Sequence, residues 1–537
     1  MLDVCGISKI FPDKKLFSNV NLKFLPGNVY GIIGANGAGK STFLKILSGE
    51  IEASEGQIIK EKNARMSVLS QNQNEFDEFI ATDVVIMGNK EMYELNIQKN
   101  KIYEDPNATV EDYEKASMLE QKYGEMGGWN AENDAQILLS NLGIAPEKWN
   151  AKMSELLANE KVKVLLAKAL FGNPDILIMD EPTNRLDLKT IKWLENFLMD
   201  YQNIVIVVSH DSDFLDAICT HIVDIDYSEA RLFTGNYSFW KQSSQLMIEM
   251  QQKQNLKKEE QAQKLREFIA RFSANASKSK QATSRKKLLD KIVIDELKPS
   301  SRKYPFIKFE LNRAPGKQIL NVQNLSYVND AGETLFENVN FTIRPGDKMV
   351  IIGYDDIAKT RLLEILMHKR KPTTGTVEWG ITIKPNYLPN NNSEYFSESK
   401  TIIEWISKWP LNNSTQETKD NSDSRMRAFL GRMLFSNDSV FKNVTVTSGG
   451  EKVRLMMSKL MLEESNFLIF DQPLDHLDSE SIDSLIDAIK SYKSSCIFTT
   501  YNRAMIKECA SVILEIKPKS SYLFYGTLDE YEEAMGY

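Results

Sequence analysis

A glycine-rich segment beginning at Gly34, GANGAGKS, has the residue types and spacing of a phosphate-binding loop. It follows a short apolar run and precedes FLKILSG, which has a helical pattern, and this context strengthens the match. Gly34, Gly37 and Gly39 allow backbone N–H groups to close on phosphate oxygens, and the start of the following helix favours negative charge. Lys40 is expected to reach the β- and γ-phosphates of ATP, and Ser41 to bind Mg²⁺. The alternative is a chance glycine-rich turn.

Two adjacent carboxylates, Asp180 and Glu181, close the apolar run ILIMD, so their side chains point to opposite sides of a predicted strand end. Asp180 is predicted to hold Mg²⁺ through water, and Glu181 to polarise the water that attacks the γ-phosphate. His210 follows the next apolar run, IVIVVS, where it could contact the γ-phosphate. A lone histidine is usually structural, but this position beside the carboxylates favours a catalytic role. Gln71, in VLSQNQ, is predicted to sense the γ-phosphate and Mg²⁺, although alone it reads as a surface glutamine.

The elements that would position these residues occur twice. ILIMDEPTNRLDL returns as FLIFDQPLDHLDS at an offset of 291, and GIIGANGAGKST returns as VIIGYDDIAKTR at an offset of 319. The first half therefore holds 28 extra residues between Gln71 and Asn159. Short apolar runs alternating with helical patterns indicate buried parallel strands of an α/β sheet, with functional loops at the carboxyl ends of the strands.

The segment TSGGEKVRL in the second half contains a Ser-Gly-Gly turn that opens a helix, 21 residues before the aspartate of a predicted strand. With GANGAGKS and LIMDEP, it resembles the signature of the ATP-binding-cassette superfamily. The resemblance implies two tandem P-loop NTPase domains that close head to tail. Each ATP would then lie between the P-loop of one domain and the signature of the other.

Departures from these motifs fall into one of the two implied sites. In the second half Gly37 and Gly39 are replaced by Asp356 and Ala358, while Lys359 and Thr360 remain. The remaining replacements are Asn390 for Gln71, Gln472 for Glu181, Tyr501 for His210, and Leu157, Ala158 and Asn159 for the first-half signature. Head-to-tail pairing places all of these losses in one site. We therefore predict one hydrolytic site and one impaired site, although Lys359 leaves nucleotide binding there open.

The predicted site residues fall into three overlapping sets. The catalytic residues are Lys40, Glu181 and His210. The metal ligands are Ser41, Gln71 and Asp180. The nucleotide contacts implied by the motifs and the resemblance are Phe11, Gly34, Asn36, Gly37, Gly39, Lys40, Ser41, Thr42, Gln71, Asp180, Ser448, Gly449, Gly450 and Glu451.

Composition limits the remaining choices. The chain has 537 residues, 42% of them apolar, which suits two domains and a connector. Four dispersed cysteines without a C-x-x-C pattern indicate neither a disulfide framework nor a zinc site, and favour a reducing, cytoplasmic location. No uninterrupted apolar run reaches about 18 residues, so no membrane segment is expected.

Charge is concentrated between the two halves. The net charge is −8, yet residues 264–291 carry nine basic residues against two acidic ones. Helical spacing on both sides of SANASKSKQATS predicts two antiparallel helices with a small, basic tip. A charged helix is usually just a solvated face, but the small tip residues permit close approach to a phosphodiester backbone. The predicted RNA contacts are Arg271, Lys278, Lys280, Arg285, Lys286 and Lys287.

Tandem cassettes, an insertion in the first, a basic helical linker and DEPTN after the first strand together resemble the ABC-F family. The linker ARFSANASKSKQATSRKKLLDKI is similar to that of its YbiT-like branch. The resemblance implies that the linker is a P-site tRNA interaction motif and that the insertion forms an arm, spanning about residues 91–127, that contacts the ribosome. It also implies binding at the ribosomal E site, with rRNA and tRNA as partners, no DNA and no membrane.

The predicted organisation is a first domain at 1–240, a linker at 241–303 and a degenerate second domain at 304–537, in a monomer whose domains pair with each other. The leading hypothesis is an ATP- and Mg²⁺-dependent translation factor. The alternatives are the ATPase subunit of a transporter and a largely non-catalytic ribosome-binding regulator.

Overall fold

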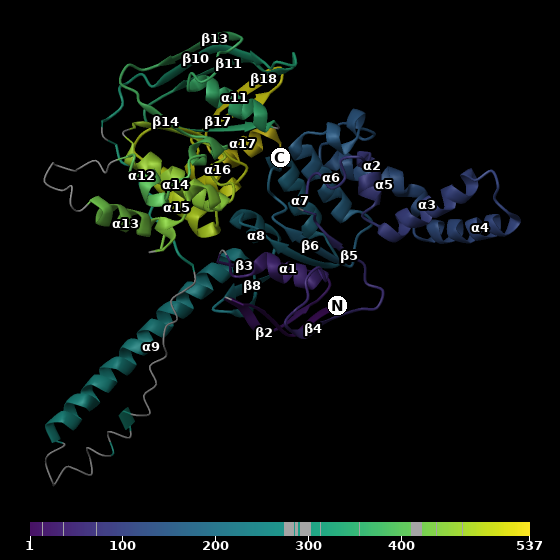
Figure 1. Ribbon diagram of the computed structural model, residues 1–537, viewed down its shortest axis with the longest axis horizontal. Coiled ribbons are helices and arrows are strands. Elements are labelled where there is room, and N and C mark those ends of the chain that lie inside the picture. Colours follow the sequence, from purple (N-terminus) through teal and green to yellow (C-terminus); the bar gives the residue numbers. More distant parts are fainter. Residues whose placement is uncertain are drawn as a thin grey trace.

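In the computed structural model the molecule consists of two similar α/β halves, and the connector between them begins with a long helix (Figure 1). The structure describes residues 1–12, 14–35, 37–70, 72–272, 284, 288–289, 302–311, 313–353, 355–409, 422–436, 438–463 and 465–536. Each half contains one six-stranded sheet and one three-stranded sheet. The duplication expected from the repeated motifs is therefore present in the fold.

The large sheet of the first half has the order β5-β6-β7-β3-β8-β9, with five parallel strands and an antiparallel β9 at the edge. A smaller antiparallel sheet has the order β2-β1-β4. The strands are β1 (Leu2–Phe11), β2 (Lys14–Phe24), β3 (Asn28–Gly34), β4 (Glu55–Lys60), β5 (Met66–Val68), β6 (Ile176–Asp180), β7 (Ile204–Val208), β8 (His221–Asp226) and β9 (Glu229–Thr234).

The helices of the first half cover the large sheet, except for two that project from it. These two, α3 and α4, lie side by side at one end of the molecule (Figure 1). Lys122 of α4 forms an ion pair with Glu91 of α3 at 2.6 Å. They occupy the region predicted as the arm, whose ribosomal contact stays a prediction. The helices are α1 (Lys40–Ser48), α2 (Ala81–Ile86), α3 (Lys90–Glu104), α4 (Val110–Glu125), α5 (Ala131–Asn141), α6 (Ala158–Leu170), α7 (Leu188–Met199) and α8 (Ser212–Ile218).

The second half repeats this topology. Its large sheet has the order β14-β15-β16-β12-β17-β18, which matches the first sheet strand for strand, and its small sheet has the order β11-β10-β13. The strands are β10 (Leu320–Val328), β11 (Thr334–Ile343), β12 (Lys348–Gly353), β13 (Thr374–Trp379), β14 (Pro385–Leu388), β15 (Phe467–Asp471), β16 (Cys496–Thr499), β17 (Val512–Lys517) and β18 (Ser520–Tyr525). The helices are α11 (Asp356–Leu366), α12 (Ile402–Ile406), α13 (Ser422–Arg432), α14 (Gly449–Leu462), α15 (Ser479–Ser491), α16 (Arg503–Cys509) and α17 (Leu528–Met535). The predicted fold class of two tandem P-loop NTPase domains is confirmed.

The apolar runs of the sequence are the central strands of these sheets. Every residue of β7 is buried, as are the first four residues of β6. Parallel strands covered by helices on both faces are buried on both sides, which explains why their sequences are continuously apolar and do not alternate. The carboxyl ends of these strands carry the predicted catalytic residues and direct them to one edge of the sheet.

A single long helix, α9 (Tyr237–Phe272), leaves the first half and extends away from both sheets (Figure 1). It is the first helix of the predicted hairpin, and most of the returning part lies outside the described residues. Among the helices that the structure describes, none is both long and apolar enough to cross a membrane. The domain limits 1–240, 241–303 and 304–537 stay predictions.

Candidate functional site

The phosphate-binding loop of the first half joins β3 to α1. Gly34 ends β3, Lys40 begins α1, and between them Gly37 and Gly39 have φ values of 73° and 103°. Glycine adopts this left-handed conformation without steric cost. A Cβ atom on Gly34 would lie 2.4 Å from the carbonyl oxygen of Ile225. The loop therefore allows the close backbone approach that a bound phosphate requires.

Lys40 lies inside this loop. Its ammonium donates hydrogen bonds to the carbonyl oxygens of Gly34, at 2.7 Å, and Ala35, at 3.3 Å. Burial lowers the pKa of Lys40, while the carboxylate of Glu181 opposes that shift. Ser41 follows in the first turn of α1 and is exposed. The structure thus places a cation and a hydroxyl at the mouth of the loop, as the motif predicts.

The paired carboxylates lie where β6 ends. Asp180 is the last residue of the strand, and Glu181 follows with a φ of 54°, an uncommon conformation for a residue other than glycine. The Glu181 N–H donates to the carbonyl oxygen of Val208 at 2.8 Å, which ties this turn to the neighbouring strand. One oxygen of Glu181 accepts a hydrogen bond from the backbone N–H of His210 at 3.1 Å. The surrounding structure therefore holds a strained residue in place, as is common at functional sites.

The other oxygen of Glu181, Oε1, is buried and has no hydrogen-bond partner within the described part of the chain. It lies 3.4 Å from Nε2 of His210. Burial raises the pKa of Glu181 to about 8, and the carboxylate of Asp180 adds to this shift. A carboxyl group with a pKa near neutrality and an unbonded oxygen beside a cavity is well placed to exchange a proton with water.

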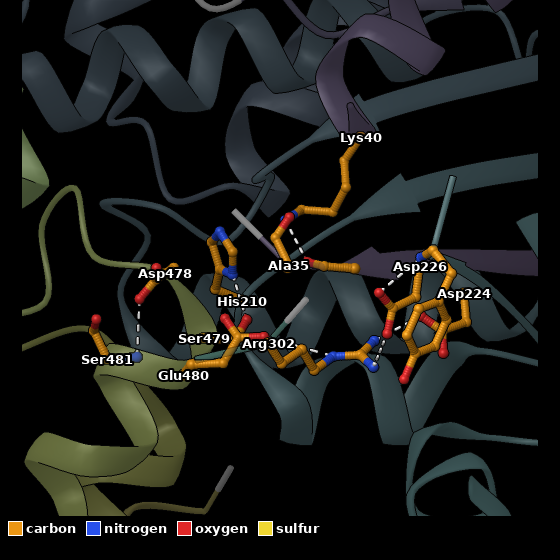
Figure 2. A network of polar contacts seen from close by, with 12 residues as sticks. Ala35, Lys40, His210, Asp224, Asp226, Arg302, Asp478, Ser479, Glu480 and Ser481 are labelled. Atoms are coloured by element: carbon orange, nitrogen blue, oxygen red, sulfur yellow. Dashed lines mark hydrogen bonds and ion pairs between the residues drawn. The ribbon is translucent and has the colours of Figure 1, made fainter. Parts of the chain in front are cut away.

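His210 connects the two halves. Its Nδ1 lies 2.5 Å from the hydroxyl oxygen of Ser479, the first residue of α15 in the second half (Figure 2). Burial lowers the pKa of His210 to about 4, and the charge of Lys40 acts in the same direction. The imidazole is therefore neutral, so that one ring nitrogen donates and the other accepts. The three predicted catalytic residues lie close together, and the second half completes their surroundings.

A cavity of about 470 Å³ lies between the halves at this point. Asp180, Glu181 and His210 line it from the first half, and Gln472 and Tyr501 from the second. Because both predicted sites open onto this cavity, the structure joins them in one space between the halves.

The predicted signature lies at the start of α14 in the second half. The hydroxyl of Ser448 accepts a hydrogen bond from the Glu451 N–H, and the Glu451 carboxylate accepts one from the Ser448 N–H, which caps α14. A Cβ atom on Gly450 would lie 2.6 Å from the carbonyl oxygen of His476, and Gly449 also packs on His476. Within the described residues, no hydrogen bond or ion pair joins the signature to the first P-loop. Its contribution to an ATP site stays a prediction.

Comparisons with known proteins identify the chain. A family model described as ABC transporter matches residues 17–184 and 336–475, and a second of the same description matches 223–309. An uncharacterized ABC transporter ATP-binding protein, YkpA of Bacillus subtilis (strain 168), is 47% identical over 99% of this chain and 97% of its own length. ABC transporter F family member 5 of Arabidopsis thaliana is 31% identical over 95% of this chain and 74% of its own length.

The chain belongs to the ABC-F family. The probable ATP-binding protein YbiT of Escherichia coli O157:H7 is 42% identical over the full length of both chains. An archaeal ribosome recycling factor, aABCE1, solved in complex with a ribosomal stalk protein, has a TM-score of 0.62 at 16% identity, covering 99% of this chain and 92% of its own. At that identity the likeness is one of fold. As an ABC-F protein the chain is a P-loop ATPase with two ABC domains.

In this ABC-F chain the second P-loop has become part of a helix. α11 begins at Asp356, three residues before Lys359, whereas α1 begins at Lys40 itself. The Asp355 side chain accepts a hydrogen bond from the Ile357 N–H at 2.8 Å, and the Lys359 N–H donates to the Asp355 carbonyl oxygen. The Lys359 N–H, which would face a phosphate in an intact loop, is thus satisfied within the first turn of α11.

The lysine of the second P-loop, Lys359, already forms an ion pair with a carboxylate of the chain. Asp356 Oδ1 lies 2.9 Å from the Lys359 ammonium, and it accepts hydrogen bonds from the Tyr501 hydroxyl and the Gln472 amide, each at 2.6 Å. The Lys359 ammonium lies 3.9 Å from the centre of the Tyr501 ring. Only 1% of the Lys359 side chain is exposed. Side chains of the ABC-F protein thus supply the negative charge that a phosphate would supply in the first site.

Other polar groups of the second site are also bonded to side chains of the same half. Asp471, the counterpart of Asp180, is fully buried and accepts hydrogen bonds from Thr360 at 2.7 Å, Thr499 at 2.9 Å and Tyr387 at 3.3 Å. Thr360 corresponds to the serine predicted to bind Mg²⁺ in the first half. Two second-half groups that correspond to predicted metal ligands, Thr360 and Asp471, therefore bond to each other.

The first-half counterpart of the signature keeps its helix but not its chemistry. α6 begins at Ala158, and the residue before it, Leu157, has no hydroxyl to accept a hydrogen bond. Asn159, in the position of the second signature glycine, is buried. The side of the second site that the first half would supply is therefore altered as well.

We expect the Asp356→Asn substitution to destabilise the second half of the ABC-F protein. It leaves the buried Lys359 ammonium without its carboxylate, and breaking one side of a buried ion pair costs about 3 kcal/mol of unfolding free energy. Differential scanning calorimetry measures the change. Asp330→Asn, at an exposed carboxylate of the same half, is the matched control. Equal and small shifts for both variants would show that Asp356 does not stabilise the second half.

Two contacts in the first site carry no signal in the sequence motifs. The Lys14 ammonium donates to the carbonyl oxygen of Gly37 at 2.7 Å, so Lys14 closes one side of the P-loop. Phe11 pairs with Lys14 across β1 and β2, which brings this exposed ring to the same edge. Ser479 is the second such contact. Its only trace in the sequence is that a hydroxyl replaces the apolar Leu188 at the offset of 291.

The remaining predicted residues lie in α1, at the end of α9 or outside the described residues. Thr42 lies in the first turn of α1, beside Ser41. The side chain of Arg271, at the end of α9, is not described. Asn36, Gln71, Lys278, Lys280, Arg285, Lys286 and Lys287 lie outside the described residues.

Proposed function

We propose that this ABC-F protein is a translation factor that binds the ribosome and hydrolyses ATP at one composite site, formed by the first P-loop and the second-half signature. The observation that carries the proposal is the contrast between the two sites. Glu181 and His210 line one cavity, His210 and Lys40 line a second, and one carboxylate oxygen of Glu181 has no hydrogen bond among the described residues. In the second site Asp356 instead forms an ion pair with Lys359. The first arrangement can act on a nucleotide, and in the second the lysine already faces a carboxylate of the chain.

The residues of the first site fit ATP and Mg²⁺. Ser41, Gln71 and Asp180 would hold Mg²⁺, which neutralises phosphate charge when it is bound. Lys40 and the start of α1 supply positive potential for the β- and γ-phosphates. The left-handed glycines leave room for this approach.

Two side chains divide the proton chemistry. In its ionised form Glu181 accepts the proton of the attacking water through Oε1, the oxygen that the described structure leaves unbonded. His210 is neutral, and if Ser479 donates to Nδ1 then Nε2 carries the proton and donates toward the γ-phosphate. Closure of the halves would bring Ser448, Gly449 and Gly450 to the same phosphate, because a helix start of this kind favours anions.

Two observations support ribosome binding, namely the connector and the structures of similar fold. α9 carries the chain away from both halves, and the basic residues 278–287 follow it directly in the sequence (Figure 1). A second structure of the same fold, a model of ribosome-bound archaeal Pelota and ABCE1, has a TM-score of 0.59 at 16% identity and covers 99% of this chain and 80% of its own. A basic, projecting connector on an acidic protein suits rRNA and tRNA. We place it at P-site tRNA, with the protein in the E site.

Replacing five connector residues with glutamine tests this proposal. The changes at Lys278, Lys280, Arg285, Lys286 and Lys287 remove up to five phosphate contacts and leave both ATP sites untouched. We expect basal ATP hydrolysis to persist while ribosome binding weakens. Each lost contact lowers the slope of log affinity against log salt by roughly 0.7 to 0.9.

The measurement is ribosome affinity at several salt concentrations. A variant with five surface lysines of the first and second halves changed to glutamine is the matched control, since it alters net charge equally. Unchanged affinity and slope in the connector variant would mean that the connector is only a spacer.

A further inference from the structure

The connector begins and ends at one place, beside the first P-loop. The ring of Trp240, near the start of α9, lies 5.0 Å from the guanidinium carbon of Arg302, near the end of the connector. A cavity of about 80 Å³ at this point is lined by both of these residues and by Lys40 and His210. The two ends of the connector therefore meet at the edge of the proposed hydrolytic site.

Arg302 bonds to both halves of the molecule (Figure 2). Its guanidinium forms ion pairs with Asp224 at 2.6 Å and Asp226 at 3.5 Å, both in β8 of the first half. It also lies 3.5 Å from Glu480, the second residue of α15 in the second half. The Glu480 side chain is only 5% exposed. Charges buried to this degree depend on their partners, so each ion pair constrains the groups on both sides.

The ion pair with Glu480 leads directly to the catalytic histidine. Ser479 precedes Glu480 in the first turn of α15, and its hydroxyl oxygen lies 2.5 Å from His210 Nδ1. Asp478 caps the helix by accepting a hydrogen bond from the Ser481 N–H at 2.9 Å, which keeps the turn together. A displacement of Glu480 that shifts this turn therefore also shifts the hydroxyl that orients His210.

We propose that Arg302 is a positioning residue that couples the connector to the first ATP site by holding the first turn of α15 against His210. The inference rests on the proposed function of that site. A shift of the connector changes the position of Arg302, which changes the contact between Ser479 and His210. Coupling is reciprocal, so closure of the halves on ATP also moves the end of the connector.

The structure offers a matched comparison for this role. Glu195 in α7 forms another buried ion pair across the halves, with Arg503 at 2.9 Å, and its side chain is 1% exposed. The Arg503 contact involves no connector residue. Glu480→Gln and Glu195→Gln therefore make the same chemical change at two interface ion pairs, and only the first concerns Arg302. The Glu480 change also keeps both ion pairs with β8, which protects folding of the first half.

The first readout is steady-state ATP hydrolysis. We expect Glu480→Gln to lower kcat about three- to thirty-fold with little change in KM, because coupling contacts of this kind shift rates on that scale without touching the nucleotide. Glu195→Gln is expected to change kcat by less than about twofold. Equal loss in both variants would overturn the proposal, because Arg302 would then be one interface contact among several.

The second readout needs neither ribosomes nor turnover. In the Glu181→Gln background, we expect ATP to change the rate of trypsin cleavage at the basic residues 278–291, and the added Glu480→Gln substitution to abolish that response. An undiminished response in the double variant would overturn the proposal, as would an absence of response in the parent. Failure of ribosome binding would leave this result unaffected, whereas a wild-type protein without ATP hydrolysis would refute the proposed function itself.

Discussion

Replacing Lys40 with alanine is expected to lower ATP turnover by about two to three orders of magnitude, as removal of one charge-stabilising group does in other active sites. The same change at Lys359 is expected to alter turnover by less than about twofold, because Lys359 faces none of the residues proposed for hydrolysis. Lys40 is held in the first P-loop beside Glu181, whereas Lys359 bonds to Asp356 and is closed off by Tyr501. Steady-state phosphate release from the two purified variants measures the difference.

Folding must be separated from catalysis in this comparison. Lys359 is almost fully buried, so its removal lowers stability even where it leaves chemistry intact. Circular dichroism and calorimetry give the folded fraction, and turnover is expressed per folded molecule. Equal losses of turnover from Lys40→Ala and Lys359→Ala would refute the asymmetry of the two sites.

The Glu181→Gln substitution is expected to trap ATP. The amide has the shape of the carboxylate, and its oxygen can still accept the hydrogen bond from the His210 N–H, but it cannot take a proton from water. Loss of a general base lowers the rate of the chemical step by about 10²- to 10⁴-fold. Binding contacts from Lys40 and Ser41 persist, so nucleotide stays bound while hydrolysis stops.

Two measurements follow the trapped protein. Gel filtration followed by nucleotide analysis should recover unhydrolysed ATP, and sedimentation should find the protein with ribosomes when ATP is present. The Lys40→Ala protein is the control, because it should neither retain ATP nor sediment with ribosomes. Release of ADP at the wild-type rate would show that another group is the base, and sedimentation with membranes would favour the transporter alternative.

The sequence allowed the fold, and the grouping of the candidate residues of the first site, to be predicted because their signals are local. The P-loop lies within eight residues, and each carboxylate or histidine directly follows an apolar strand. The carboxyl ends of parallel strands meet at one edge of a sheet, so residues far apart in the chain, such as Asp180 and Lys40, are brought together. The equal strand orders of the two halves follow from the repeat.

Contacts across the halves could not be predicted in this way. His210 and Ser479 are 269 positions apart and share no motif, so only the docking of the two halves brings them together. The same holds for Arg302 and Glu480. The early start of α11 carried a weaker signal, since Asp355 is a favourable helix cap, but the choice between loop and helix depends on Asp356, Tyr501 and Gln472 acting together.

The length of α9 converts a small tilt at its base into a larger displacement of its far end. Its 36 residues extend about 54 Å at 1.5 Å per residue, so each degree of tilt at its base displaces its far end by about 1 Å. The base of this lever, where Trp240 meets Arg302, lies at the first site and not at the second. A tilt of a few degrees at this base would therefore carry the far end of α9 through several ångströms.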